Sequence, residues 1–295
     1  MEIWAVIVPA VKFALYISIL LSAGGHLFLL VFGGDMPSSL ITKSLRRRCR
    51  NMASLALGLS ILSLFVMSGS LGGDLASVFD LMLVGLVIDS PAGAAIMLQS
   101  LGLILLVAGT SLPRGIGRWT LGDIGGGLGV IITLLAFTRV GHATIDAPLL
   151  QILLAIHLLG IVFWLGALLP LLRLCKDDMP LDILARVSHQ FGRYALVLVG
   201  GLVASGMGYA YVLVGSPSQL FGSSYGQFLL VKIALVAAML GLAALNKLRL
   251  VPRLLAGDEG ARTGLASSIK YEITLACCIL GVTSLLTTSL ALPIL

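Results

Sequence analysis

The feature that most constrains this chain is a series of apolar runs, each close to the ~20 residues that a helix needs to cross a bilayer. Eight such runs divide the 295 residues, and only short polar segments separate them. They lie at about Trp4–Phe32, Met52–Ser70, Pro91–Thr110, Leu121–Thr138, Leu149–Leu172, Arg193–Val214, Gly226–Leu245 and Tyr271–Ala291. The sequence therefore predicts an all-α polytopic membrane protein, an eight-transmembrane-helix bundle.

Composition supports this class, because 58% of the residues are hydrophobic and only 11% are charged. No stretch is large enough for a soluble domain, so we expect one membrane domain, 1–295, with four helices in 1–140 and four in 141–295. The net charge of +6 comes from residues in short loops, which argues against nucleic-acid binding. The four cysteines show no CxxC spacing, so we expect neither a disulfide framework nor a zinc site.

The distribution of Lys and Arg predicts the orientation. If the first loop is cytoplasmic, all but one of the loop cations fall on the inner side, and only Arg139 falls outside. The inner segments collect Lys43, Arg46, Arg47, Arg48, Arg50, Arg114, Arg118, Arg173, Lys176, Arg186, Arg193, Lys247, Arg249, Arg253, Arg262 and Lys270. We therefore expect both termini to face the periplasm.

The fifth run carries the most informative ionisable residue, His157. At 3.6 residues per turn, His157, Gly160 and Trp164 share one stripe of that helix. A titratable ring inside a membrane span is a functional hypothesis by default. The alternative is a neutral His that hydrogen-bonds a neighbouring helix and fixes the packing.

Several side chains that suit copper are expected near the outer face. His142 lies in an outer loop, and His157 is ~13 Å down its helix at 1.5 Å per residue. Met97 and Met207 fall at ~9 to 11 Å by the same rise, and Met67 is near the outer end of the second helix. Imidazole and thioether groups suit copper, with thioether favouring Cu(I), although methionine is also an adaptable packing residue.

Three further charged residues bear on this layer. Lys232 lies ~9 Å into the seventh helix, where an ammonium group would repel a metal ion, so we expect it to pair with Asp89 or Asp146. Asp89 and Ser90 precede Pro91, which is also typical of a helix cap. Glu272 is expected in the first turn of the eighth helix, where the helix dipole favours an acid. The segment Leu71 to Asp89 is the longest loop, and its apolar middle predicts a short helix on the membrane surface.

The second half of the chain also resembles a known family. The segments HLLGIVFWLGALLPLL from His157, FGRYALVLVGGLVASGMGYAYVLVGS from Phe191 and SSYGQFLLVKIALVAAMLGLAALNKLRLVPRL from Ser223 look like the copper resistance D family of inner-membrane proteins. This resemblance implies an eight-helix copper transport protein that works beside a periplasmic copper-binding partner of the copper resistance C type. No such domain occurs in these residues, so the partner is expected to be separate or absent. His157 and Lys232 both fall within the matched segments.

We therefore predict copper transport across the bacterial inner membrane, inward from the periplasm, with a copper ion, Cu(I) or Cu(II), as cargo. No nucleophile, base and orienting acid form a recognisable set, so an enzyme is not expected. One alternative is a membrane redox protein that holds haem between two His ligands. The depth mismatch between His26 and His157 argues against it, whereas His142 with His157 stays open. Another is a non-transporting membrane anchor for a copper chaperone.

The charge asymmetry generates a topology prediction. Alkaline phosphatase, which is active only in the periplasm, is expected to be active when fused after Leu295 and silent when fused after Arg50. Phosphatase activity in cells expressing each fusion is the measurement. Activity of the Arg50 fusion would overturn the orientation, and every depth along the helices would invert with it.

Overall fold

The computed structural model describes residues 3–36, 39–112, 119–140, 147–176, 179–214 and 217–288. In these ranges seven helices are long and apolar enough to cross a membrane, and Leu121–Phe137 is a shorter apolar helix. The described residues contain no β-strand. The prediction of an all-α polytopic membrane bundle is confirmed.

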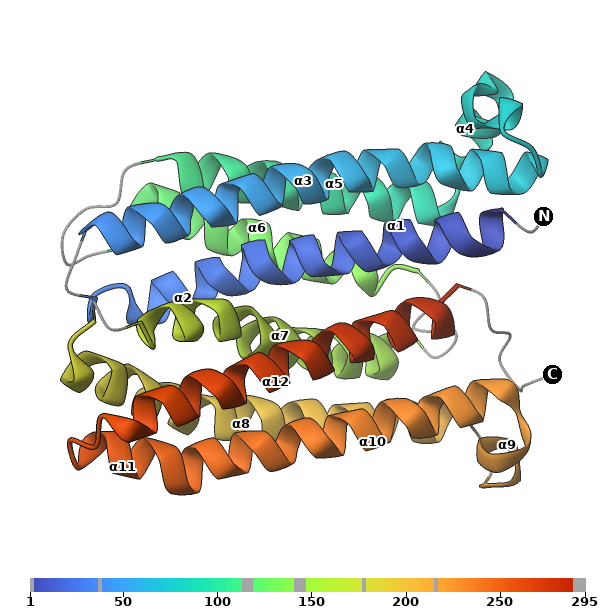
Figure 1. Ribbon diagram of the computed structural model, residues 1–295. Coiled ribbons are helices and arrows are strands. Elements are labelled where there is room, and N and C mark those ends of the chain that lie inside the picture. The colour runs from blue at the N-terminus through green and yellow to red at the C-terminus, as the bar shows by residue number, and fades with distance from the viewer. Residues whose placement is uncertain are drawn as a thin grey trace.

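The long helices run side by side in one bundle (Figure 1). In chain order the elements are α1 (Trp4–Ile19), η1 (Leu20–Gly24), α2 (Gly25–Phe32), α3 (Ser39–Gly72), η2 (Ala76–Phe79), α4 (Leu81–Ile88), α5 (Pro91–Ser111), α6 (Leu121–Phe137), α7 (Ala147–Leu174), α8 (Leu181–Val214), α9 (Pro217–Gly222), α10 (Ser224–Leu245), η4 (Asn246–Leu250), α11 (Val251–Leu255) and α12 (Gly260–Leu286). Of these, η1 and η4 are π-helical and η2 is a 3-10 turn.

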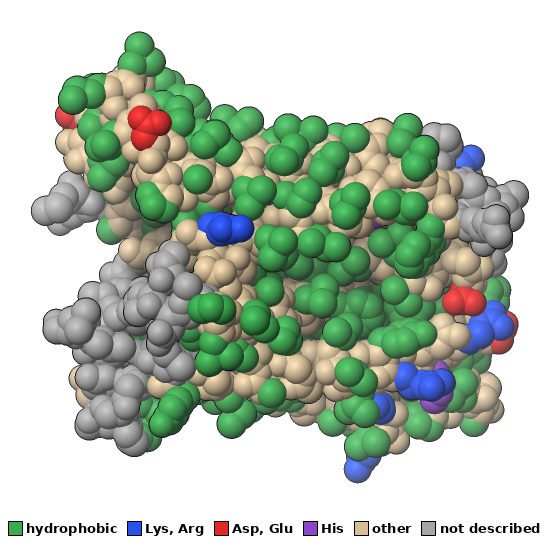
Figure 2. Space-filling model, turned by 180° about the vertical axis from the view of Figure 1, so that it is seen from behind, with side chains coloured by type: hydrophobic (Ala, Val, Ile, Leu, Met, Phe, Trp, Pro, Cys, Tyr) green, Lys and Arg blue, Asp and Glu red, His purple; other side chains and the backbone are tan. Residues whose placement is uncertain are grey.

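The two ends of the bundle differ in chemistry. The start of α1 and the end of α12 lie at one end, together with α4 and α9; we call it the terminal end (Figure 1). The opposite end carries α11 and the start of α3, and most Lys and Arg side chains on the face in Figure 2 gather there. We call it the basic end. Hydrophobic side chains cover the flank between the two ends, as expected for a surface that meets lipid (Figure 2).

Three helices begin earlier than the apolar runs predicted. They start at Ser39, Leu181 and Gly260 rather than near Met52, Arg193 and Tyr271. A helix satisfies its backbone in water as well as in lipid, so it continues past the apolar run into the basic segment beside it. The expectation that Glu272 lies in a first helical turn is therefore wrong, since twelve residues of α12 precede it.

The loop between the second and third spans contains the short helix that the sequence predicted. The Asp80 carboxylate caps α4 by accepting from the backbone N–H groups of Met82 and Leu83 at 2.8 and 3.3 Å. In Figure 1 α4 projects sideways from the terminal end of the bundle. Leu81 and Met82 are 86% and 85% exposed, so this projection presents an apolar surface beside the bundle.

Helix α7 joins two packed cores. One contains Leu103, Leu106 and Val130 of α5 and α6, and it also takes Val162 of α7. The other contains Met239 and Ile279 of α10 and α12, together with residues on the other side of α7. Between α7 and η1 the backbones meet at two glycines: a Cβ added to Gly24 would lie 2.4 Å from the Gly166 Cα. Small residues at such a crossing allow this close approach.

This contact generates a stability prediction. We expect Gly166→Ala to destabilise the bundle by about 1–3 kcal/mol, because the new methyl group overlaps the backbone of Gly24 and of Leu20. Gly58→Ala on α3 is the matched control, since an added Cβ there meets nothing within 4 Å. Thermal unfolding of the purified proteins in one detergent is the measurement. Equal melting temperatures for the two variants would show that the glycine crossing is not needed.

Candidate functional site

The His157 ring lies between α7 and α8, and a hydrogen bond fixes its tautomer. Its Nδ1 is 3.0 Å from the backbone oxygen of Leu202. A carbonyl oxygen only accepts, so Nδ1 carries the proton and donates to it. The other nitrogen, Nε2, then keeps its lone pair, and among the described residues no hydrogen bond to it is formed. Metal-binding histidines commonly have this arrangement, with one ring N–H held by a backbone carbonyl.

The surroundings of His157 leave the ring little freedom. A Cβ added to Gly206 of α8 would lie 2.9 Å from the His157 Cε1, so only glycine accommodates the ring there. Lys232 of α10 is close enough to His157 for an electrostatic interaction. In the part of the chain described here Lys232 forms no ion pair: the expected pairing with Asp89 is not formed, and Asp146 lies outside the described residues.

A second set of polar side chains surrounds Trp164, which lies two turns after His157 on α7. The buried carboxyl group of Glu272, on α12, accepts a hydrogen bond from the Asn246 Nδ2 and lies within hydrogen-bonding reach of the Trp164 indole. Glu272 is 2% exposed and Trp164 is 4% exposed. Asn246 is the first residue of the π-helical segment η4, a type of irregularity that is frequent at functional sites. Three helices thus bring one acid, one amide and one indole together inside the bundle.

These residues form a line with a regular spacing. Lys232, Met239 and Asn246 follow one another at seven-residue intervals on α10 and η4, which is two turns or ~10.5 Å a step. His157 and Trp164 have the same spacing on α7. Met239 is 1% exposed and packs in the same core as Trp164. We call His157, Lys232, Met239, Trp164, Asn246 and Glu272 the polar line.

Sequence reasoning found only part of the polar line. It singled out His157, Trp164 and Lys232, missed Met239 and Asn246, and placed Glu272 at a helix end. The seven-residue spacing of Lys232, Met239 and Asn246 was the available signal, because it places all three on one face of a helix.

The predicted layer of soft ligands does not converge around His157. Met97 on α5 and Met207 on α8 are 52% and 69% exposed and face away from the packed interior. Met67 and Asp89 do lie together, since both line a groove where α3, α4 and α5 meet at the terminal end. Asp89 directly follows α4 as its C-cap residue, and the Ser90 side chain caps α5 by accepting from the Gly93 N–H at 3.2 Å. His142 lies outside the described residues.

His26 belongs to a different polar cluster, near the basic end of the first half. Its Nε2 is 3.2 Å from the Asp123 backbone oxygen, and a Cβ on Gly126 would overlap the ring. The Asp123 carboxylate pairs with Arg46 at 2.7 Å, and both side chains are buried. The Arg46 guanidinium also donates to the carbonyls of Gly109 and Leu112, each at 2.8 Å. These bonds tie α2 and α3 to the facing ends of α5 and α6, which is a structural role.

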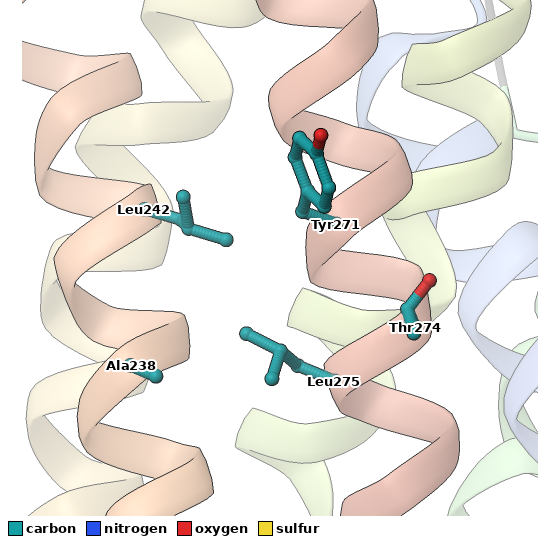
Figure 3. A pocket seen from close by; sticks show the side chains of 5 residues that line it. All are labelled: Ala238, Leu242, Tyr271, Thr274 and Leu275. Carbon is teal, nitrogen blue, oxygen red and sulfur yellow. The ribbon is translucent and has the colours of Figure 1, made fainter.

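Neither the distribution of metal-binding side chains nor the groove between α10 and α12 indicates a further metal site in the described residues. Within the described ranges, no three His, Cys, Asp or Glu side chains are grouped so that they could hold a metal ion. The groove between α10 and α12 is lined by Ala238, Leu242, Tyr271, Thr274 and Leu275 (Figure 3). Tyr271 is 66% exposed whereas the adjacent Glu272 is buried, so this groove opens on the side of α12 away from the polar line. Its apolar walls suit a lipid chain better than an ion.

The fold and the polar line define a polytopic helical membrane protein with ionisable and soft side chains in the interior of its second half. Residues 1–152 match the family described as Copper resistance protein D-like, N-terminal domain, and residues 185–286 match Copper resistance protein D. The chain therefore belongs to the copper resistance protein D family, as its sequence resemblance indicated.

Three curated relatives illustrate the range of this similarity. Copper transport protein CutJ of Bacillus subtilis is 27% identical over 95% of this chain, which spans 52% of that protein. Inner membrane protein YebZ of Escherichia coli is 28% identical over 95% of this chain and 96% of its own length. Copper resistance protein D of Pseudomonas syringae pv. tomato is 31% identical over 50% of each chain. The chain thus spans about half the length of two of these relatives. No solved structure matches it.

Proposed function

We propose that this protein moves copper across the inner membrane, inward from the periplasm, and that His157 is the first ligand within the bundle. The observation that carries this proposal is the Nδ1–H bond from His157 to the Leu202 carbonyl, which leaves the Nε2 lone pair for a metal. Relatives named for copper transport and copper resistance support copper as the cargo. The names of these relatives do not describe enzymes.

The same proposal includes orientation and partner. Positively charged loops stay in the cytoplasm, so the basic end is the cytoplasmic end and both termini face the periplasm. His157 is ten residues into α7 from the terminal end, or ~15 Å, within reach of an ion that enters from the periplasm. A periplasmic copper-binding protein of the copper resistance C type would deliver the ion at this end, where Met67 and Asp89 line an open groove.

Met239 is the second ligand that we propose. It is a thioether in the packed interior, on the helix that also carries Lys232, and thioether sulfur favours Cu(I). We assign to Met239 the role of thioether ligand that the sequence suggested for Met97 and Met207, because those two side chains face away from the interior. The Lys232 ammonium opposes a cation at His157 while it is protonated, so the site favours copper when Lys232 is neutral.

The sequence left two alternative functions, and for haem only the pair of His26 and His157 can be compared with the structure, because His142 lies outside the described residues. A haem held by His26 and His157 requires both rings to reach one iron atom. Depths can be measured from the level at which Gly24 contacts Gly166. At 1.5 Å per residue, His26 lies ~3 Å from this level toward the basic end, and His157 lies ~13 Å from it toward the terminal end. The two rings are therefore too far apart in depth to share one iron atom. A chaperone anchor that transports nothing has no use for a line of ionisable groups that are buried or half-buried within the bundle, which are costly in a membrane.

The role of His157 is tested by three substitutions. We expect His157→Ala to lower copper uptake at least about tenfold while the protein still inserts and accumulates. His157→Met keeps a soft ligand atom and is expected to retain part of the uptake with Cu(I), whereas His157→Leu, of similar size, is not. Uptake of copper into proteoliposomes, normalised to the amount of protein, is the measurement. Wild-type uptake by His157→Leu would remove His157 from the path.

The role of Met239 is tested by a matched pair of substitutions. Met239→Leu and Met207→Leu delete the same sulfur atom with little change in volume, one in the interior and one on the exposed face. We expect Met239→Leu to weaken Cu(I) uptake several-fold and Met207→Leu to leave it unchanged. The concentration of Cu(I) that gives half-maximal uptake is the measurement. If both variants behave like the wild type, copper does not pass Met239.

A further inference from the structure

Glu272 is the most deeply buried acid of the second half of the bundle, and its position is unusual for a carboxyl group. It lies twelve residues into α12, or ~18 Å from the basic end of that helix. At 2% exposure it is removed from water on all sides. Among the described residues, the Asn246 amide donates a hydrogen bond to it, and the Trp164 indole lies within hydrogen-bonding reach of it. Both are neutral donors.

No cation compensates Glu272 within the part of the chain described. Three cations of η4, α11 and α12 have partners other than Glu272: Lys247 donates to the Gly192 carbonyl, Arg253 pairs with Asp258, and Arg262 pairs with Glu259. Among the described residues, no other titratable group of α12 or of the elements packed against it forms a salt bridge or hydrogen bond with Glu272. These groups are Lys12 and Tyr16 of α1, His157 and Arg173 of α7, Lys232 of α10, Arg249 of η4, and Lys270, Tyr271, Cys277 and Cys278 of α12. Lys12 and Tyr16 bond Thr287, fifteen residues beyond Glu272.

A carboxylate in this place is costly without a positive charge beside it, because neither lipid nor packed apolar side chains solvate the ion. Two neutral donors stabilise a carboxylate only in part. The Asn246 Oδ1 is also buried and accepts no hydrogen bond from the described residues, so the amide offers an oxygen as well as its N–H group at this level. The site therefore suits one positive charge, either a proton on Glu272 or a cation passing beside it.

We propose that Glu272 is a proton-binding site that exchanges its proton for the transported cation. In the empty protein Glu272 is a neutral carboxylic acid. When Cu⁺ passes the level of Trp164 and Asn246, the acid releases its proton to water and the carboxylate balances the charge of the ion; when Cu⁺ leaves, a proton from water returns. This proposal rests on the transport function proposed above and adds to it an exchange of one proton for one Cu⁺.

The protonation of Glu272 is tested without any transport measurement. In purified wild-type protein at about pH 7, where ordinary carboxyl groups are ionised, infrared spectra are expected to show a carboxylic acid band. We expect this band to be missing in Glu272→Gln and present in Glu259→Gln, a matched control at the exposed start of the same helix. Glu272→Asp keeps an acid at this position and is expected to keep a band. A wild-type spectrum whose carboxylic acid bands are unchanged in Glu272→Gln would overturn the proposal.

The exchange is tested in proteoliposomes that are supplied on the outside with Cu⁺ held reduced by ascorbate. For a one-to-one exchange, making the lumen one pH unit more acidic than the outside raises the accumulation of copper about tenfold, since one unit is a factor of ten in proton activity. We expect wild type and Glu259→Gln to show this dependence and Glu272→Gln to lose it. A Glu272→Gln protein whose copper accumulation follows the pH gradient as in the wild type would contradict the exchange.

The two experiments separate this proposal from the function on which it rests. If wild-type vesicles take up no copper, the transport function fails, and the infrared band still shows whether Glu272 holds a proton. If wild-type vesicles take up copper and the infrared band persists in Glu272→Gln, transport stands and Glu272 is not the proton site.

Discussion

The close contact between Gly24 and Gly166 sets the position of α7, and the geometry of the second half depends on α7. With glycine on both sides, the backbone of η1 approaches the middle of α7 to a distance that any side chain would prevent. This places Val162 in the core of the first helices and Phe163 and Trp164 in the core of the last ones. One helix thus serves as a wall of both cores, and it carries His157 and Trp164 at fixed depths.

The two halves use buried polar groups in different ways. In the first half Arg46 and Asp123 neutralise each other, and the remaining donors of Arg46 bond backbone carbonyls. Such a pair is costly to break, because either partner alone would be a buried charge, so it holds the basic end together. In the second half His157, Lys232 and Glu272 each lack a partner of opposite charge among the described residues. Uncompensated groups of this kind respond to ions and protons, and this difference is why we assign transport to the second half.

The two π-helical segments lie next to polar residues of the bundle interior in the chain. Segment η1 directly precedes the helix that carries His26, and η4 begins at Asn246. A π-helical turn inserts one extra residue into a helix, which shifts the side chains that follow relative to those before. At Asn246 this shift follows two regular seven-residue steps, from Lys232 to Met239 and from Met239 to Asn246. The polar line therefore ends where the regular helix ends.

The sequence by itself determined the class of protein, the number of apolar segments and the family. Each of these follows from local properties: the length of an apolar run is compared with a bilayer, and the family is recognised from contiguous residues such as those from Ser223 to Leu254. It also identified His157 and Trp164 as residues on one stripe of one helix. Depth along a helix followed from the constant rise per residue where the predicted helix start was close to the observed one, as for His157, and failed for Glu272, because α12 begins well before its apolar run.

Only the tertiary structure decided which face of each helix meets protein and which meets lipid. In a chain this apolar both faces of a helix are hydrophobic, so the pattern of hydrophobic residues does not distinguish them. Met97, Met207 and Met239 are the same residue type, each within an apolar membrane-spanning helix, yet the first two are exposed and the third is buried. Glu272 and Asn246 are far apart in the chain and meet because α10 and α12 pack side by side. The partners of a membrane-buried side chain are set by helix packing, which no local pattern specifies.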